Sequence, residues 1–236
     1  GFIGAQSARM MKRAKATERR QESAAKEKEK LLKDIERNDT LKVTPLRHHA
    51  ELLVEALDLS IAYGERVVTG PLDFTLRQGE RAVLLGKNGS GKSSIVKLLM
   101  GEDIPHTGVL RTASGLVISY MPQDTSFLSG TVTDFARANG LDETLFLTIL
   151  RKLDFPRVQF EKDMRDFSGG QKKKALLAKT LSERAHLYVW DEPLNFVDVL
   201  SRMQIRDLLL AANPTMLFVE HDKTFVSEIA TRRILL

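Results

Sequence analysis

Residues 86–93 read Gly86-Lys87-Asn88-Gly89-Ser90-Gly91-Lys92-Ser93, which fits the pattern G-x-x-x-x-G-K-[S/T] at every fixed position. Glycines let the backbone turn so that successive N–H groups point inward at phosphate oxygens. A helix that starts after this turn aims its positive N-terminal end at the same oxygens. Lys92 supplies a cation, and the Ser93 hydroxyl can ligate Mg²⁺. Together with the adjoining Ser94, the stretch predicts a phosphate-binding loop.

Strand-like and helix-like segments alternate on both sides of this loop. Residues 82–85 form a continuous apolar run, which is typical of a strand that is buried on both faces, and residues 92–100 have a helical pattern. We expect further strands at 52–61, 72–76, 109–111, 116–120, 187–190 and 216–219. We expect further helices at 133–153, from 168, at 203–211 and after 222. This order predicts an α/β fold with a largely parallel central sheet.

The basic excess of the chain lies in its first 47 residues. The whole chain of 236 residues has a formal charge of +5, whereas residues 1–47 hold 13 Lys and Arg against 7 Asp and Glu, a net charge of +6. Residues 4–38 are mostly strong helix formers with only a thin apolar seam. We therefore predict two parts, a basic helical arm over residues 1–47 and a nearly neutral domain over residues 48–236.

The composition excludes several classes of protein. Without cysteine, the chain has no disulfide scaffold, no cysteine-ligated zinc and no thiol nucleophile. No apolar run approaches the roughly 18 residues of a membrane span, and no apolar signal core follows the basic N-terminal stretch. We expect a cytoplasmic protein without membrane insertion. Because the chain begins at Gly1 and not at Met, we also expect it to be a piece of a longer protein.

A pair of acids ends one of the apolar strands. Residues 187–192 read LYVWDE, and the carboxyl end of a strand in a parallel sheet opens beside a phosphate loop. Asp191 can hold Mg²⁺ through its water shell, and Glu192 can polarise an attacking water as a general base. Many strands end in solvated acids, so this pattern is weak alone. Combined with the phosphate loop, it favours nucleotide hydrolysis.

Residues 167–171, FSGGQ, resemble the LSGGQ signature of ABC ATPases, with Phe in the leading position. The other motifs of that family follow in order between about residues 51 and 236. They are Tyr63, Gln123, Glu192-Pro193, Asp198 and His221. The resemblance implies a P-loop nucleotide-binding domain that has an antiparallel β subdomain and a helical subdomain beside its parallel sheet. It also implies ATP and Mg²⁺ as cofactors.

The resemblance assigns a role to each matching residue. Tyr63 would stack on adenine. The implied catalytic residues are Glu192, His221, which would contact the γ-phosphate, and Gln123, and the implied Mg²⁺ ligands are Ser93, Gln123 and Asp191. The signature residues Ser168, Gly169, Gly170 and Gln171 would begin a helix with Ser168 as N-cap and bind the ATP of an opposite domain. One domain alone then has two half-sites, so we expect it to bind ATP and hydrolyse it poorly.

Three kinds of ABC protein remain: a membrane-transporter ATPase, a soluble ABC-F protein with two nucleotide-binding domains in one chain, and an SMC-like DNA-associated head. In an SMC-like head, a coiled coil would separate the phosphate loop from the signature, and residues 86–168 contain none. The basic arm occupies the place of the ABC-F interdomain linker, and the helical insert is compact. Residues 192–198, EPLNFVD, resemble the ABC-F form EPTNHLD, with Asn195 where transporters commonly have Ser. We therefore predict an ABC-F protein, with the transporter as the alternative.

Residues 190–205, WDEPLNFVDVLSRMQI, look most like the antibiotic-resistance ABC-F proteins of Gram-positive bacteria. That resemblance implies two partners: the N-terminal nucleotide-binding domain of the same full-length protein, and the ribosome. The rRNA and tRNA would be reached through residues 1–47, whose Lys and Arg can neutralise phosphates. A solvated helix that contacts no nucleic acid is the alternative for this arm. We also interpret the run Lys172-Lys173-Lys174 as a solvated helix face, with phosphate or RNA contact as the less favoured reading.

Overall fold

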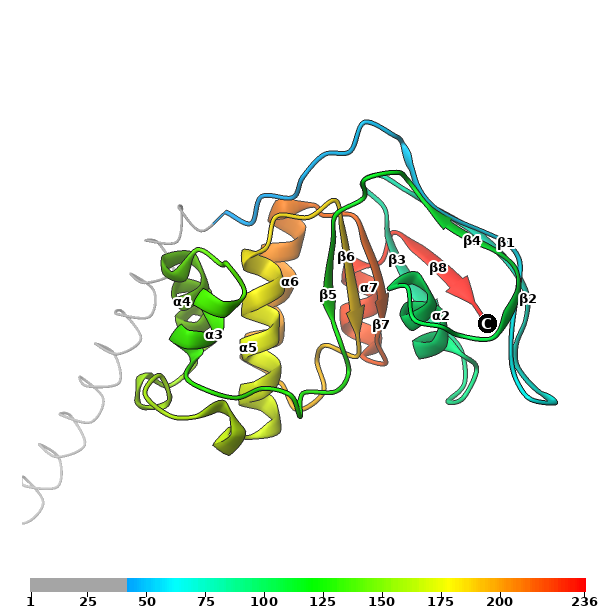
Figure 1. The fold of residues 1–236 in the computed structure, drawn as a ribbon. Helices are drawn as coiled ribbons and strands as arrows, with labels where there is room; N and C mark the ends of the chain where they lie inside the picture. Colours follow the sequence, from blue (N-terminus) through cyan, green and yellow to red (C-terminus); the bar gives the residue numbers. More distant parts are fainter. Residues whose placement is uncertain (1–41) are drawn as a thin grey trace, which may run out of the picture. The chain divides into compact units, whose positions relative to one another are not determined.

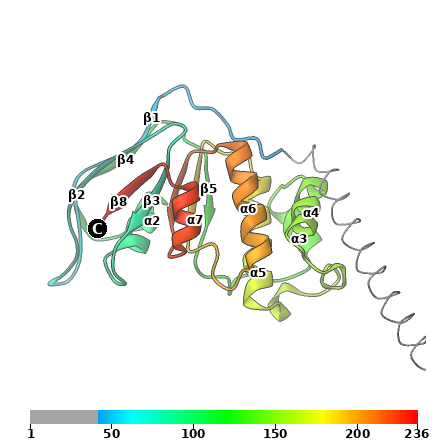
Figure 2. The ribbon, with the colours of Figure 1, turned by 180° about the vertical axis from the view of Figure 1, so that it is seen from behind.

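A computed structural model of the chain describes residues 42–236 (Figures 1 and 2). The predicted basic helix therefore lies outside the described residues, as does the rest of the arm up to residue 41. Residues 42–47 of the predicted arm are described, and they form no helix. Val43 is buried, and the Leu46 N–H donates to the Ala185 carbonyl over 2.8 Å. These six residues thus belong to the compact unit Lys42–Leu236.

The central sheet has five strands in the order β5-β6-β7-β3-β8, and the neighbouring pairs are parallel. Its strands are β3 (Arg81–Leu85), β5 (Ile118–Met121), β6 (Leu187–Asp191), β7 (Met216–Val219) and β8 (Arg232–Leu235). Every residue of β6 and β7 is buried, which explains why both strands read as continuous apolar runs. The predicted α/β class is confirmed. Strand β8 was not predicted, because its four residues include two arginines and give no apolar run.

A smaller antiparallel sheet has the order β2-β1-β4, from β1 (Leu52–Tyr63), β2 (Arg66–Arg77) and β4 (His106–Thr112). A two-residue turn, Gly64-Glu65, joins β1 to β2. Between the two sheets lies α2 (Lys92–Leu99), which follows the phosphate loop (Figures 1 and 2). Its apolar residues Ile95 and Val96 are fully buried in a core that includes residues of both sheets. This core fixes the phosphate loop between the sheets.

The remaining helices are α3 (Val132–Ala138), α4 (Glu143–Lys152), α5 (Gly169–Ser182), α6 (Val199–Ala212) and α7 (Lys223–Ile229), with short 3₁₀ turns at Arg157–Gln159 and Met164–Asp166. α4 packs against α5, and α6 packs against α7 on the face of the parallel sheet that Figure 2 turns to the viewer. In the described part of the chain, none of the helices is long and apolar enough for a membrane crossing.

Two helix predictions differ from the structure. The predicted helix at 133–153 is two helices, because Gly140 has a left-handed φ of 62° and the Asp142 side chain caps a new helix by accepting the Leu145 N–H. The helix predicted at 203–211 starts four residues earlier, at Val199. The cause is the Asp198 side chain, which accepts the Ser201 N–H as N-cap. Both differences come from capping side chains.

Leu84→Ala should lower the free energy of unfolding by about 2–5 kcal/mol, because Leu84 is fully buried on β3 and its truncation leaves a cavity. The matched control is Leu235→Ala on the neighbouring strand β8, where the side chain is 72% exposed. We expect that control to change stability by no more than about 0.5 kcal/mol. Urea denaturation followed by circular dichroism measures both, and equal losses would contradict this description of the core.

Candidate nucleotide site

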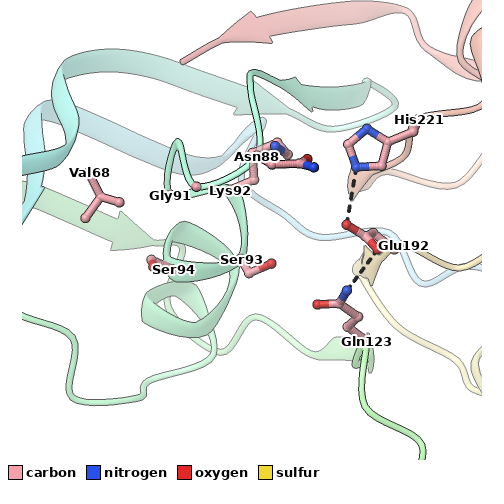
Figure 3. Close-up of a pocket in the computed structure, with 10 residues that line it drawn as sticks. Val68, Asn88, Gly91, Lys92, Ser93, Ser94, Gln123, Glu192 and His221 are labelled. Carbon is pink, nitrogen blue, oxygen red and sulfur yellow. Dashed lines mark hydrogen bonds and ion pairs between the residues drawn. The ribbon is translucent and has the colours of Figure 1, made fainter.

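A cavity of about 500 Å³ opens at the carboxyl ends of β3, β6 and β7 (Figure 3). Its lining residues come from the phosphate loop, from the start of α2, from β2 and from the loops after β5, β6 and β7. They are Val68, Asn88, Gly89, Gly91, Lys92, Ser93, Ser94, Gln123, Glu192 and His221. The fold therefore brings the phosphate loop together with Gln123, Glu192 and His221, although up to 135 residues separate them in the sequence.

Lys92 holds the phosphate loop in its turned shape. Its side chain is buried, and its ammonium group donates to the carbonyls of Gly86 and Lys87, both over 2.9 Å. The Lys92 ammonium group accepts no hydrogen bond from the N–H groups of the loop, and it places a positive charge beside them. This combination of a central cation, glycines and a following helix is suited to binding phosphate.

Thr69, on β2, anchors the same loop from the antiparallel sheet. It is 3% exposed, and its hydroxyl donates to the Ser90 carbonyl over 2.8 Å. Gly91 passes so close to Thr69 that a Cβ on residue 91 would lie 2.0 Å from the Thr69 hydroxyl oxygen, and Gly91 has a left-handed φ of 89°. Glycine is required at position 91 for both reasons. Thr69 was not predicted as a site residue, since a threonine in a strand carries no local signal for this contact.

Tyr63, at the end of β1, lies beside the phosphate loop but is not among the residues that line the cavity. Its hydroxyl is 2.9 Å from the Ser94 hydroxyl, and its side chain is largely exposed. An exposed ring next to a polar cavity is available for stacking on a base. The predicted contact with adenine stays a prediction. Val68, one residue before Thr69 on β2, lines the cavity and was missed by the sequence analysis.

Three side chains converge on the Glu192 carboxylate. The Gln123 amide donates to Glu192 Oε2 over 2.9 Å, and His221 Nε2 lies 3.3 Å from Oε1 (Figure 3). Asn195 donates to the same Oε2 over 2.8 Å. Glu192 itself has a left-handed φ of 51°, which turns its side chain out of the strand direction and into the cavity. The structure thus brings together the three residues that were predicted to be catalytic, and it places the Asn195 amide at the same carboxylate.

Asp191 is the last residue of β6 and is 2% exposed. Burial raises the pKa of its carboxyl group, a shift that a hydrogen bond from Ser93 opposes. Its Oδ1 atom is buried without a hydrogen-bond partner among the described residues. An unpaired buried carboxylate oxygen beside a serine hydroxyl fits a divalent cation, which prefers such oxygen ligands. Within residues 42–236 there is no cluster of three or more His, Asp or Glu side chains suited to a metal.

The signature residues do not line this cavity. Ser168 is the N-cap of α5, as predicted, and it forms a reciprocal capping box with Gln171. Gly169 and Gly170 face Phe196, and a Cβ on residue 170 would lie 2.5 Å from the Phe196 carbonyl oxygen. In this chain the signature glycines are therefore also needed for close packing against the loop between β6 and α6. Binding of an opposite domain's ATP stays a prediction.

The interpretation of Lys172-Lys173-Lys174 as a solvated face is wrong for two of the three lysines. Lys173 is 4% exposed and donates to the Gln123 carbonyl over 3.0 Å, while burial lowers its pKa. Lys174 is buried too, and it forms an ion pair of 2.7 Å with Asp198. Charge patterning missed this because adjacent helical residues point in different directions, and here two of the three point inward.

Comparison with protein families identifies one match, to the family described as ABC transporter, over residues 69–195. The ATP-binding protein Uup of Caulobacter vibrioides is 31% identical over 193 residues, which are 78% of this chain and 32% of that protein. The zinc import ATP-binding protein ZnuC of Photobacterium profundum is 33% identical over 178 residues, which are 72% of this chain and 69% of that protein. The chain thus spans about a third of the length of Uup and most of the length of ZnuC.

Among solved structures, the archaeal ribosome recycling factor aABCE1, in complex with the ribosomal stalk protein aP1, is similar in fold. The TM-score is 0.65 at 25% sequence identity, and the similarity covers 83% of this chain and 40% of that one. The family match, over residues 69–195, includes the phosphate loop at residues 86–93. The similarity therefore covers the domain that carries the cavity.

Thr69→Val should weaken ATP binding about fivefold, because loss of a hydrogen bond worth about 1 kcal/mol releases the Ser90 carbonyl and loosens the phosphate loop. Valine keeps the shape of threonine, so the fold should survive. Isothermal titration with ATP measures the change. Thr107→Val, at an exposed position on β4, is the matched control and should leave the affinity unchanged. Equal affinities in the two variants would show that Thr69 does not support the loop.

Lys174→Gln should lower the free energy of unfolding by about 1–2 kcal/mol, because it leaves Asp198 without its ion pair. The loss is smaller than for a fully buried pair, since the Asp198 side chain is 49% exposed. Lys172→Gln changes the neighbouring and more accessible lysine and should have almost no effect. Thermal melting of both variants tests this, and a loss at position 174 no larger than that at position 172 would show that the Lys174–Asp198 pair does not stabilise the fold.

Proposed function

The chain belongs to the ABC transporter family of ATP-binding domains, and from this premise we propose that it is one half of a tandem ABC-F ATPase that acts on the ribosome. Members of the family hydrolyse ATP, and this chain is such an ATPase domain. The observation that carries the proposal for its chemistry is the convergence of Gln123, Asn195 and His221 on the Glu192 carboxylate inside the phosphate-loop cavity.

In this proposal, Glu192 is the general base for hydrolysis. Its Oε2 is held by two amide donors and its Oε1 faces His221, so the carboxylate is oriented before substrate arrives. Lys92 and the loop from Gly86 to Ser94 bind the phosphates, and His221 contacts the terminal phosphate. Tyr63 stacks on the adenine ring. Each residue of this set lies at the cavity or beside it.

Asp191, Ser93 and Gln123 would hold Mg²⁺. The unpaired Oδ1 of Asp191 and the neighbouring Ser93 hydroxyl supply oxygen ligands of the kind that this ion prefers. When bound, Mg²⁺ neutralises charge on the β- and γ-phosphates. Within the protein, the hydrogen bond from Ser93 and the charges of Lys173 and Lys97 oppose the upward shift that burial imposes on the pKa of Asp191.

A second nucleotide-binding domain completes the site in this proposal. The signature residues at the start of α5 present a helix N-terminus that is not used by the cavity of the same chain. The similarity of this chain to about a third of Uup, a considerably longer ATP-binding protein, is compatible with a partner domain in the same polypeptide. The N-terminal domain of the full-length protein is the partner that we propose.

The ribosome is the proposed target for three reasons. Residues 1–47 carry a net charge of +6, which suits rRNA or tRNA phosphates. The sequence EPLNFVD at residues 192–198 resembles the ABC-F motif. A fold with a TM-score of 0.65 to this chain occurs in an archaeal ribosome recycling factor. We further propose that the full-length protein protects the ribosome from antibiotics that act at the peptidyl-transferase centre, because residues 190–205 resemble the resistance subgroup.

The nucleotide-binding subunit of a membrane transporter is the second candidate. The zinc import protein ZnuC is 33% identical to this chain, and 69% of its length is covered. In that case the chain would dock on a transmembrane partner through its helical segment, α3 and α4. The basic residues 1–47 and Asn195 favour the ribosomal candidate, since neither is expected in a transporter ATPase.

Glu192→Gln in the full-length protein should lower the rate of ATP hydrolysis at least about 100-fold, because glutamine cannot accept the proton of the attacking water. ATP binding should persist, so the variant should stay in an ATP-bound complex that sediments with 70S ribosomes. Sucrose-gradient centrifugation at low salt, with and without ATP, measures this. The salt is kept low because phosphate contacts weaken steeply with ionic strength.

Glu228 is an exposed glutamate on α7, and Glu228→Gln is the control. This variant should hydrolyse ATP at the rate of the parent protein and dissociate from the ribosome after hydrolysis. If the trapped Glu192→Gln protein stays in the supernatant, the ribosomal proposal is wrong, whatever the hydrolysis rate. Co-sedimentation with membranes that contain a transporter partner would favour the second candidate.

Protection of the ribosome is tested separately, by translation in vitro in the presence of a lincosamide. The parent protein should restore protein synthesis in this assay.

A further inference from the structure

Glu220 is a carboxylate that is only 4% exposed, and it lies immediately before His221. Its Oε1 accepts the N–H groups of His221 and Asp222 over 2.8 and 3.2 Å. Its Oε2 accepts the N–H of Leu194 over 3.1 Å. Three backbone donors therefore compensate the burial of one negative charge. They come from two loops, the loop after β7 and the loop after β6.

Arg202, on α6, joins the same two loops by donating hydrogen bonds to acceptors in both of them. Its Nε donates to the Val197 carbonyl over 2.8 Å, and its Nη2 donates to the Leu194 carbonyl over 3.3 Å. Its Nη1 donates to the Asp222 carboxylate over 2.6 Å. A planar guanidinium group can serve three acceptors in different directions at once, which a lysine cannot do. Leu194 is thus held at its N–H by Glu220 and at its carbonyl by Arg202.

The two joined loops carry the residues proposed for chemistry. Glu192 stands two residues before Leu194, and His221 directly follows Glu220. Their side chains meet at 3.3 Å, between Nε2 and Oε1, although they lie in the loops that follow two different strands. The backbone pairing of β6 with β7 extends to Glu192, whose N–H donates to the Val219 carbonyl over 2.9 Å. Beyond that bond, Glu220 and Arg202 connect the loops.

We propose that Glu220 and Arg202, here called the loop bridge, are positioning residues that keep the Glu192 carboxylate and the His221 imidazole aligned for ATP hydrolysis. This inference rests on the proposed role of Glu192 as general base. Among the described residues, no hydrogen bond or ion pair joins Glu220 or Arg202 to the phosphate loop, so we expect the loop bridge to act on the chemical step far more than on nucleotide affinity. The rate of ATP hydrolysis depends steeply on this alignment, because small displacements of a general base lower the rate strongly.

The test uses Glu220→Gln and Arg202→Lys in the full-length protein. Glutamine keeps the size of glutamate but has one acceptor oxygen in place of two, so at least one of the three N–H groups loses its partner. Lysine keeps the charge of arginine but cannot span the three acceptors. We expect each variant to lower kcat for ATP hydrolysis about tenfold while the Kd for ATP changes less than twofold. Amide hydrogen exchange should accelerate at Leu194 and stay unchanged in β3.

The matched controls are Glu228→Gln on α7 and Arg206→Lys on α6. Arg206 lies one helical turn from Arg202 and forms ion pairs with Asp207 and Glu228 at the surface. Among the described residues, neither control side chain forms a hydrogen bond or ion pair with the loops after β6 or β7, so kcat should equal that of the parent. An equal fall of kcat in the controls, or a parent-like kcat in both loop-bridge variants, would overturn the inference.

A double variant separates positioning from a merely structural effect. If the loop bridge acts through Glu192, then Glu192→Gln combined with Glu220→Gln should hydrolyse ATP no more slowly than Glu192→Gln alone. Additive losses would overturn the inference. If Glu220→Gln does not fold, the same cycle with Arg202→Lys decides. If Glu192→Gln hydrolyses ATP at the parent rate, Glu192 is not the general base, and both the proposed function of Glu192 and this inference are refuted. If amide exchange at Leu194 is unchanged in the loop-bridge variants, only the inference about Glu220 and Arg202 is refuted.

Discussion

The site depends on the parallel pairing of three strands. Main-chain hydrogen bonds join β3 to β7 and β7 to β6 in a register that sets Leu84 and Asp191 opposite Val219. Because the strands are parallel, their carboxyl ends meet at one edge of the sheet. The phosphate loop, the Asp191-Glu192 pair and His221 follow these ends. A slip by one residue would turn the Asp191 side chain to the other face and separate it from Ser93.

The second constraint is the burial of charged groups, and it follows from the parallel pairing of the strands. Where the strands end, the chain places charged groups at the boundary of the apolar core, among them Lys92, Lys173, Asp191 and Glu220, all less than a tenth exposed. Burial shifts the pKa of Asp191 upward and that of Lys173 downward, and the Coulombic attraction between these two groups opposes both shifts. Glu220 is compensated by backbone N–H groups. These charged groups and the groups that compensate them therefore form one network within the site.

Much of this arrangement could be predicted from local patterns. The phosphate loop is a contiguous motif, and the strand runs show continuous apolar character, so the α/β class and the acid Glu192 at a strand end were accessible from these patterns. Gln123 and His221 were expected only from the resemblance to ABC ATPases, and both line the cavity. The capping role of Ser168 was accessible too, because a cap is a contact between near neighbours. The break at Gly140 and the start of α6 at Val199 were missed, since capping by Asp142 and Asp198 competes with apolar periodicity that continues past them.

The sequence by itself determined the phosphate loop, the acids at the end of β6 and the signature helix start, because each depends on residues a few positions apart. Only the tertiary structure decided that Thr69 supports the phosphate loop, that Lys173 and Lys174 point inward, and that Glu220 and Arg202 join the loops that carry Glu192 and His221. These contacts link residues 8 to 50 positions apart, as between Arg202 and Leu194 or between Lys173 and Gln123. No local pattern records such a contact, since a side chain's partner over that distance is set by the path of the backbone.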